Sequence, residues 1–215
     1  HVYSGTFLFA DAVRLLRKRG KFMQEAVPVG VGSMTAIIGL SREQVLDACA
    51  MAREEGVVEP ANFNCPGQIV ISGEAKAVEK AAAIAAEMGA KRTVPLAVSA
   101  PFHCSLLVSA GEKLKAELDK VDVHEMKVPV VANVNGEIVP SVDYVRESLY
   151  KQVSNPVLWE DCVRTMIGKG VDTFIEIGPG KVLSGFVKKT DKNVRTLNVE
   201  DITSLENTLR ELAKG

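Results

Sequence analysis

The first clear pattern along the chain is a helical one. Hydrophobic positions recur every three to four residues, which predicts an amphipathic helix over residues 9–27. Basic side chains fill most of the other positions of this segment, and an exposed basic helix face is usually just solvated. Gly20 interrupts the pattern at a cost in helix stability, so we expect something else to approach the helix closely there. A glycine-rich connection at residues 29–33 follows as a candidate boundary.

The next part of the chain predicts a small domain of four strands and two helices. Ser41 and Gln44 form a capping box that opens the first of these helices, and Gly89 ends the second. The order strand, helix, strand, strand, helix, strand is the ferredoxin-like arrangement, which we place at residues 34–96. The strands are expected at residues 34–40, 57–63, 68–72 and 91–98, and the helices at residues 41–55 and 74–88.

Beyond residue 105, strands and helices alternate, and this alternation predicts a mostly parallel α/β layer. The chain is therefore expected to be α/β, with a large domain formed by residues 1–33 and 97–215. The ferredoxin-like domain is inserted into it. The strands of this part are expected at residues 128–132, 173–177 and 194–198, and the helices from residue 105 and at residues 142–153, 159–169, 182–189 and 202–214.

Composition excludes several classes of function. The 215 residues carry a formal net charge of −1, so bulk charge indicates neither a nucleic-acid nor a membrane-surface partner. No apolar run has spanning length, and we expect no signal peptide. Residues 178–181 (GPGK) lack the further glycine and the Lys-Ser/Thr pair of a P-loop, so they predict a turn rather than a nucleotide site. The four cysteines have no CxxC spacing and the chain has only three histidines, which argues against zinc and favours thiols in a reducing cytoplasm.

One histidine stands at a position suited to chemistry. Residues 99–104 (SAPFHC) join a predicted strand to a predicted helix, which places His103 at the rim of a sheet. An imidazole titrates near neutral pH and suits proton transfer. A lone histidine more often caps or packs, so both interpretations of His103 stay open on the residues alone.

Six stretches of the chain, in order along its whole length, together resemble the malonyl-CoA:acyl carrier protein transacylases of fatty acid synthesis. The ferredoxin-like insertion also stands where that family has it. The resemblance implies an α/β-hydrolase-like parallel-sheet domain with an inserted ferredoxin-like βαββαβ subdomain. The stretches are residues 9–13 (FADAV), 19–24 (RGKFMQ), 62–68 (NFNCPGQ), 100–104 (APFHC), 151–156 (KQVSNP) and 176–183 (EIGPGKVL).

The resemblance implies a ping-pong acyl transfer in which a serine attacks the malonyl thioester and a phosphopantetheine thiol then collects the acyl group. His103 would be the general base, with the main-chain carbonyl of Gln152 fixing its tautomer. Arg19 would bind the free malonate carboxylate through two parallel hydrogen bonds. Without the resemblance, a solvated surface arginine is the preferred interpretation. The chemistry needs neither a metal nor a bound cofactor.

Four further residues complete the expected site. Phe102 would fill a pocket and reject the extra methyl of methylmalonyl by about 1–3 kcal/mol, and the alternative is that it only packs in the core. Met23 would contact substrate from the same helix as the arginine. Asn62 and Asn64 would support the mouth of the site, although a role in a turn is the favoured interpretation.

The nucleophile of this family lies in a G-x-S-x-G elbow, which these residues do not contain. The resemblance places it a few residues before His1, and we expect Ser4 to lie in the following helix and not to replace it. We therefore expect a C-terminal part of the enzyme, inactive alone, with an uncovered apolar face and a missing N-terminal segment as a partner. The other expected partners are malonyl-CoA and acyl carrier protein, in the cytoplasm. Alternatives are a non-catalytic carrier-protein-binding module and the acyltransferase domain of a polyketide-type synthase.

Overall fold

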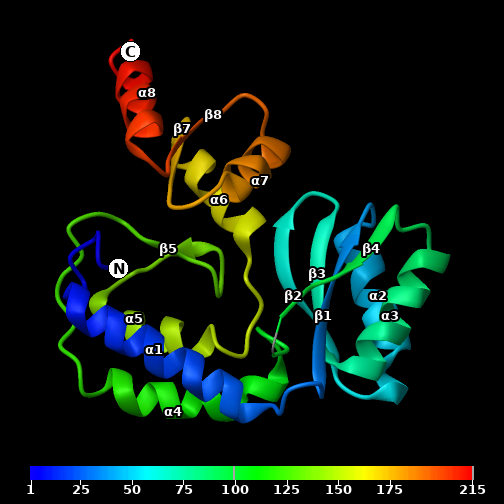
Figure 1. Ribbon diagram of the computed structural model, residues 1–215. Helices are drawn as coiled ribbons and strands as arrows, with labels where there is room; N and C mark the ends of the chain where they lie inside the picture. The colour runs from blue at the N-terminus through cyan, green and yellow to red at the C-terminus, as the bar shows by residue number, and fades with distance from the viewer. Residues whose placement is uncertain (99, 215) are drawn as a thin grey trace.

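The computed structural model describes residues 1–98 and 100–214, so Ser99 of the predicted motif lies outside the described residues. Within them the chain is mixed α/β (Figure 1). A four-stranded sheet with two helices on one face forms one part of the molecule. Long helices form a second part, and a smaller group of strands and helices near the C-terminus forms a third.

The four-stranded sheet confirms the predicted ferredoxin-like arrangement. Its neighbouring strands are all antiparallel, in the order β2-β3-β1-β4, with a helix between the first and second strands and another between the third and fourth. The predicted limits of this domain, residues 34 and 96, stay a prediction. The elements are β1 (Gly32–Ile38), α2 (Arg42–Met51), the short 3₁₀ helix η1 (Arg53–Glu55), β2 (Val58–Cys65), β3 (Gln68–Glu74), α3 (Ala75–Glu87) and β4 (Arg92–Pro95).

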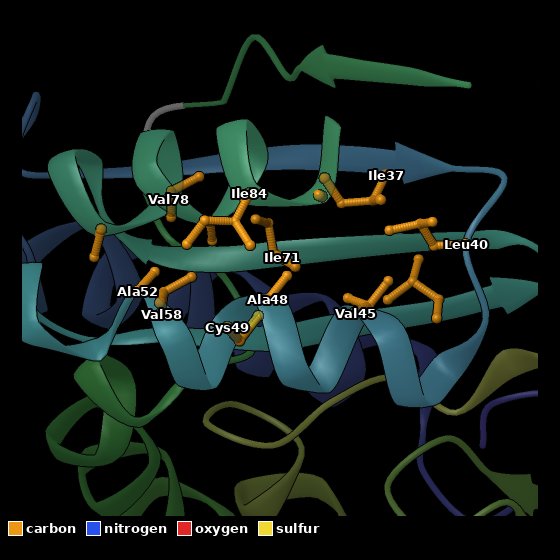
Figure 2. Packing of buried hydrophobic residues seen from close by; sticks show 14 of the residues in the cluster. Ile37, Leu40, Val45, Ala48, Cys49, Ala52, Val58, Ile71, Val78 and Ile84 are labelled. Carbon is orange, nitrogen blue, oxygen red and sulfur yellow. The ribbon is translucent and has the colours of Figure 1, made fainter. Parts of the chain in front are cut away.

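The apolar faces of α2 and α3 pack on this sheet, as Figure 2 shows. The predicted capping box opens α2: the Gln44 N–H donates to Ser41 Oγ (3.3 Å), and the Ser41 N–H donates to Gln44 Oε1 (2.9 Å). Burial of each large aliphatic side chain stabilises the fold by about 1.5–3 kcal/mol. The core contains Ile37, Val45, Val58, Ile71, Val78 and Ile84.

The helical part joins the N-terminal helix to the segment that follows His103. Its long helix α1 packs along α4, and side chains from both helices share one apolar cluster. The close approach predicted at Gly20 is wrong for the described residues, because nothing lies within 4 Å of the position that a Cβ would occupy. The elements are α1 (Phe9–Ala26), the 3₁₀ helix η2 (Ser105–Leu107), α4 (Val108–Leu118) and α5 (Val142–Lys151).

The predicted parallel layer is represented among the described residues by one parallel pair, β7 with β8. The strand expected at residues 128–132 is shorter than predicted, because only its last two residues pair, in a hairpin of β5 and β6. Pro129 lacks the N–H that a sheet ladder needs, which accounts for the lost pairing. The elements are β5 (Val131–Ala132), β6 (Glu137–Ile138), α6 (Trp159–Gly168), β7 (Thr173–Ile177), α7 (Val182–Thr190), β8 (Arg195–Val199) and α8 (Ile202–Leu212).

Large apolar side chains are exposed around this parallel pair. The exposed fraction is 79% for Ile177, 64% for Val182 and 76% for Ile202. Val182 and Ile202 lie on helices, and the uncovered apolar sheet face that the sequence predicts stays a prediction. No helix in the described part of the chain has both the length and the apolar character needed to cross a bilayer.

The four cysteines are buried and none forms a disulfide. Burial raises the pKa of the Cys49 and Cys162 thiols to about 12, and it also raises the pKa of Cys65 and Cys104. All four are therefore protonated at neutral pH and unreactive in the folded protein.

Candidate active site

His103 has a strained backbone. Its φ is +62°, and no other non-glycine residue in the described ranges has a positive φ. A non-glycine residue in this region costs about 1–3 kcal/mol and persists only where its surroundings hold it. Part of that support is close packing on β1, since a Cβ on Gly32 would lie 2.4 Å from Cγ of Pro101.

The imidazole of His103 contacts the main chain at the C-terminal end of α5. Its Nδ1 lies 2.9 Å from the carbonyl oxygen of Gln152, as the resemblance implies. A carbonyl can only accept, so Nδ1 carries the proton and Nε2 keeps a lone pair for a substrate. The side chain of Gln152 also donates to the carbonyl oxygens of Asn155 (2.9 Å) and Pro156 (3.1 Å), which fixes the loop.

The environment of His103 keeps its imidazole neutral. Burial lowers the pKa of His103 below the ordinary value of 6.5, and the positive charge of Arg19 lowers it further. The carbonyls of Gln152 and Asn155 raise the pKa of His103, but burial is the largest influence. At neutral pH this histidine is therefore a free base, as a general base must be.

Arg19 lies half-buried on α1, and burial lowers the pKa of its guanidinium. Within residues 1–98 and 100–214 its side chain forms no hydrogen bond and no ion pair. The fork of donors is therefore available to an anion. Other basic residues of α1 do have partners: Arg14 pairs with Asp11 (3.0 Å), Lys18 with Glu117 (2.5 Å) and Lys21 with Glu25 (3.7 Å).

A cavity of about 340 Å³ lies beside this arginine. Arg19 and Gln152 both line it, and Gln152 is the residue whose carbonyl oxygen contacts His103. A guanidinium in apolar surroundings binds a carboxylate strongly, because little water competes for its donors. The other walls come from His1, Val2, Phe7, Ala12, Leu15, Leu16, Leu114, Leu118 and Leu149.

Two predicted substrate contacts lie in packed surroundings. Phe102 is partly buried and packs against two separate apolar clusters, one around Met34 and Val70 and one around Leu107. Met23 is only 2% exposed and belongs to the cluster between α1 and α4. The packing alternative for Phe102 is thus present, and the substrate contacts of both residues stay predictions.

Comparison with known proteins decides the family. The acyl transferase domain family matches residues 2–212. The malonyl CoA-acyl carrier protein transacylase of Bacillus subtilis (strain 168) is 48% identical over 212 residues, covering 98% of this chain and 67% of that protein. Its Escherichia coli (strain K12) counterpart is 50% identical over 188 residues, covering 87% of this chain and 61% of that protein. The chain belongs to the malonyl CoA-acyl carrier protein transacylase family.

Solved structures of transacylases have the same fold. The enzyme from Clostridium perfringens matches with a TM-score of 0.96 and 52% identity, covering 99% of this chain and 67% of that one. A malonyl-transacylase solved in complex with a type II PKS acyl-carrier protein matches with a TM-score of 0.94 and 42% identity, covering 97% of this chain and 67% of that one. The chain thus spans about two thirds of the transacylases it matches.

The favoured turn role of Asn62 and Asn64 is wrong. Both residues lie in β2, which continues through two register shifts to Cys65. β2 also pairs with the loop after Gln152, since the Phe63 N–H donates to the Val157 carbonyl oxygen (2.8 Å). The two asparagines therefore lie on the strand that contacts this loop, and their support of the site stays a prediction.

Two further predictions concern the local structure of Ser4 and of residues 178–181. Ser4 lies in a turn before α1, not in a helix, and its buried hydroxyl bonds to the His1 carbonyl oxygen (2.9 Å) and to Thr6 Oγ1 (2.6 Å). Residues 178–181 do form a turn that leads into α7. In the first turn of α7, the N–H groups of Leu183 and Ser184 donate to the carboxylate of Glu176.

A hydrogen-bonded contact that the sequence does not predict joins β2 to the residues after His103. Both carboxylate oxygens of Glu59, on β2, accept hydrogen bonds from Ser105, one from the backbone N–H (2.8 Å) and one from Oγ (2.9 Å). The serine at the start of a helix is the only local signal, because nothing in the sequence pairs it with Glu59.

Among the described residues, no group of three or more His, Cys, Asp or Glu side chains could hold a metal ion.

Proposed function

We propose that this chain provides the carboxylate-binding arginine and the general base for malonyl transfer. The donor is malonyl-CoA and the acceptor is the phosphopantetheine thiol of acyl carrier protein, with an acyl-serine intermediate in between. The observation that carries the proposal is the half-buried Arg19, which has no partner in the described residues. Its positive charge also lowers the pKa of His103, which is neutral. A dicarboxylic thioester has the free carboxylate that such a guanidinium binds.

In the proposed mechanism, Nε2 of His103 takes the proton from the serine hydroxyl while Oγ attacks the thioester carbonyl. The imidazolium is stabilised through its Nδ1–H, which donates to the Gln152 carbonyl oxygen. It then returns the proton to the sulfur of coenzyme A as the C–S bond breaks. The second half repeats these steps in reverse, with the phosphopantetheine thiol as nucleophile and the serine as leaving group. No metal or cofactor takes part.

We further propose that the serine comes from polypeptide outside these 215 residues, which contain no G-x-S-x-G motif. The 215-residue polypeptide alone would then take up no malonyl group. The chain covers about two thirds of its relatives, which supports this proposal. The proposed location of the protein is the cytoplasm.

Intact mass spectrometry after incubation with malonyl-CoA tests both proposals. The expected result is no adduct on the 215-residue polypeptide and one malonyl group on a polypeptide extended to include the G-x-S-x-G serine. An adduct on the 215-residue polypeptide would overturn the external nucleophile. An extended, folded polypeptide that takes up no malonyl group but still binds acyl carrier protein would support the carrier-binding alternative instead.

A further inference from the structure

The segment around His103 is attached to two strands of the four-stranded sheet. Gly32 on β1 packs against the Pro101 ring. Cys104 itself donates to the Pro101 carbonyl oxygen (3.2 Å). The second attachment, Glu59 on β2, carries a charge.

Glu59 binds the chain two residues after the histidine. The Ser105 N–H and Oγ–H both donate to its carboxylate at 2.8 and 2.9 Å, across a separation of 46 residues. Charge-assisted bonds of this kind are stronger than neutral ones and fix both partners in direction. Ser105 also begins η2, so the carboxylate sets where the helical backbone starts.

That starting point matters because of the backbone of His103. A φ of +62° is unfavourable for a histidine, and release of Ser105 would let this backbone relax toward negative φ. Relaxation would turn the Cα–Cβ bond of His103 and break the 2.9 Å contact between Nδ1 and the Gln152 carbonyl. The loop of Gln152 pairs with the same strand through Phe63 and Val157.

We propose that Glu59 is a positioning residue for the general base. Its carboxylate holds Ser105, keeps His103 in the left-handed conformation and thereby keeps Nδ1 directed at Gln152. This inference rests on the proposed function, because only that function gives His103 the role of general base. The positioning itself can be measured without acyl transfer.

The direct test is ¹⁵N NMR of the histidine side chains in the 215-residue polypeptide. The chain has three histidines, and the signal that is lost in His103→Asn identifies the relevant one. In the wild type we expect the Nδ1–H tautomer and a pKa below the ordinary value. Glu59→Ala should lose the single tautomer, and the pKa of His103 should rise toward the ordinary value as the ring becomes solvated.

Two variants calibrate this result. Glu59→Gln keeps an acceptor for Ser105 and should retain most of the wild-type signature. Asp201→Ala is the matched control, because Asp201 also accepts both the N–H and the Oγ–H of a serine, Ser204, at 2.7 Å each. It should leave His103 unchanged even if it lowers stability.

The proposal is overturned if Glu59→Ala keeps the wild-type tautomer and the wild-type pKa of His103. If Glu59→Ala does not fold, Ser105→Ala decides, since it removes only the Oγ bond and should shift the tautomer part of the way. In an extended polypeptide with the serine, Glu59→Ala should lower kcat roughly 10- to 100-fold with little change in KM. An extended wild type that takes up no malonyl group would count against the proposed function, whereas the NMR result stands apart from it.

Discussion

Nδ1 of His103 lies 2.9 Å from the main-chain carbonyl oxygen of Gln152, so a backbone group orients the imidazole where many hydrolytic enzymes use a carboxylate. A carbonyl has no net charge, so it raises the pKa of His103 less than burial lowers it. The histidine is therefore neutral at physiological pH, and it becomes charged only in more acidic solution.

Stability should depend on the protonation of His103. Its folded pKa lies below the ordinary value of 6.5, so the unfolded state binds more protons between the two values. The free energy of unfolding should rise with pH across that window and gain nothing further from His103 above 6.5. Urea unfolding of wild type and His103→Asn at several pH values measures this, because asparagine tolerates a positive φ and does not titrate. The prediction would be contradicted if the free energy of unfolding changed with pH by the same amount in the two proteins.

Arg19 should determine the preference for a carboxylated acyl group. In an extended polypeptide with the serine, Arg19→Ala should lower kcat/KM for malonyl-CoA roughly 100-fold, from the loss of two bonds to a charged group. Arg19→Lys should recover little, since an ammonium cannot make two parallel bonds. Transfer from acetyl-CoA should be unchanged or faster. The exposed Arg17 on the same helix is the control, and equal losses for both donors would argue against a carboxylate site.

Two glycine substitutions should change stability in opposite directions. Gly32→Ala should lower the free energy of unfolding by about 1–3 kcal/mol, because its Cβ meets the Pro101 ring and something must move. Gly20→Ala should raise it by about 0.5–1 kcal/mol, since the site is open and alanine is the better helix former. Urea denaturation of both variants tests this, and a destabilised Gly20→Ala would show that the site is occupied in solution.

Phe102 should affect both packing and selectivity. Phe102→Ala removes a ring that contacts two clusters, and we expect a loss of about 2–4 kcal/mol in the free energy of unfolding. In the extended polypeptide, the ratio of kcat/KM for methylmalonyl-CoA over malonyl-CoA should rise about 10-fold as space opens beside the base. Phe9→Ala, at a 73% exposed phenylalanine, controls for the loss of a ring. An unchanged ratio would leave Phe102 with packing alone.

Features that depend on neighbours in the sequence could be predicted from the chain. The capping box of Ser41 and Gln44 needs only a spacing of three, and it is present. The ferredoxin-like order follows from short runs with clear boundaries, and the contact of His103 with Gln152 followed from the resemblance. Where one residue overrides a pattern, prediction failed: Pro129 removes pairing that the hydrophobic run around it suggests.

Features that depend on register between distant segments could not be predicted. The asparagines of residues 62–64 have turn composition, but β2 continues through them because pairing with β3 and with Val157 outweighs local preference. The bond of Glu59 to Ser105 requires that a strand and a helix start come together across 46 residues. Hydrophobic spacing carries no information about such a pair.

The four buried thiols have a practical consequence. A reagent such as dithiobisnitrobenzoate reacts with thiolates, and the folded chain offers it none, because every cysteine is enclosed and protonated. The coloured product of the reagent should therefore appear only as fast as the folded chain opens and exposes its cysteines. Three of these sulfurs lie on different parts of the fold, Cys49 on α2, Cys104 beside the histidine and Cys162 on α6. In variants that keep a single cysteine, the rate of labelling would report the rate at which that part of the fold opens. The buried cysteines are therefore native probes of local unfolding.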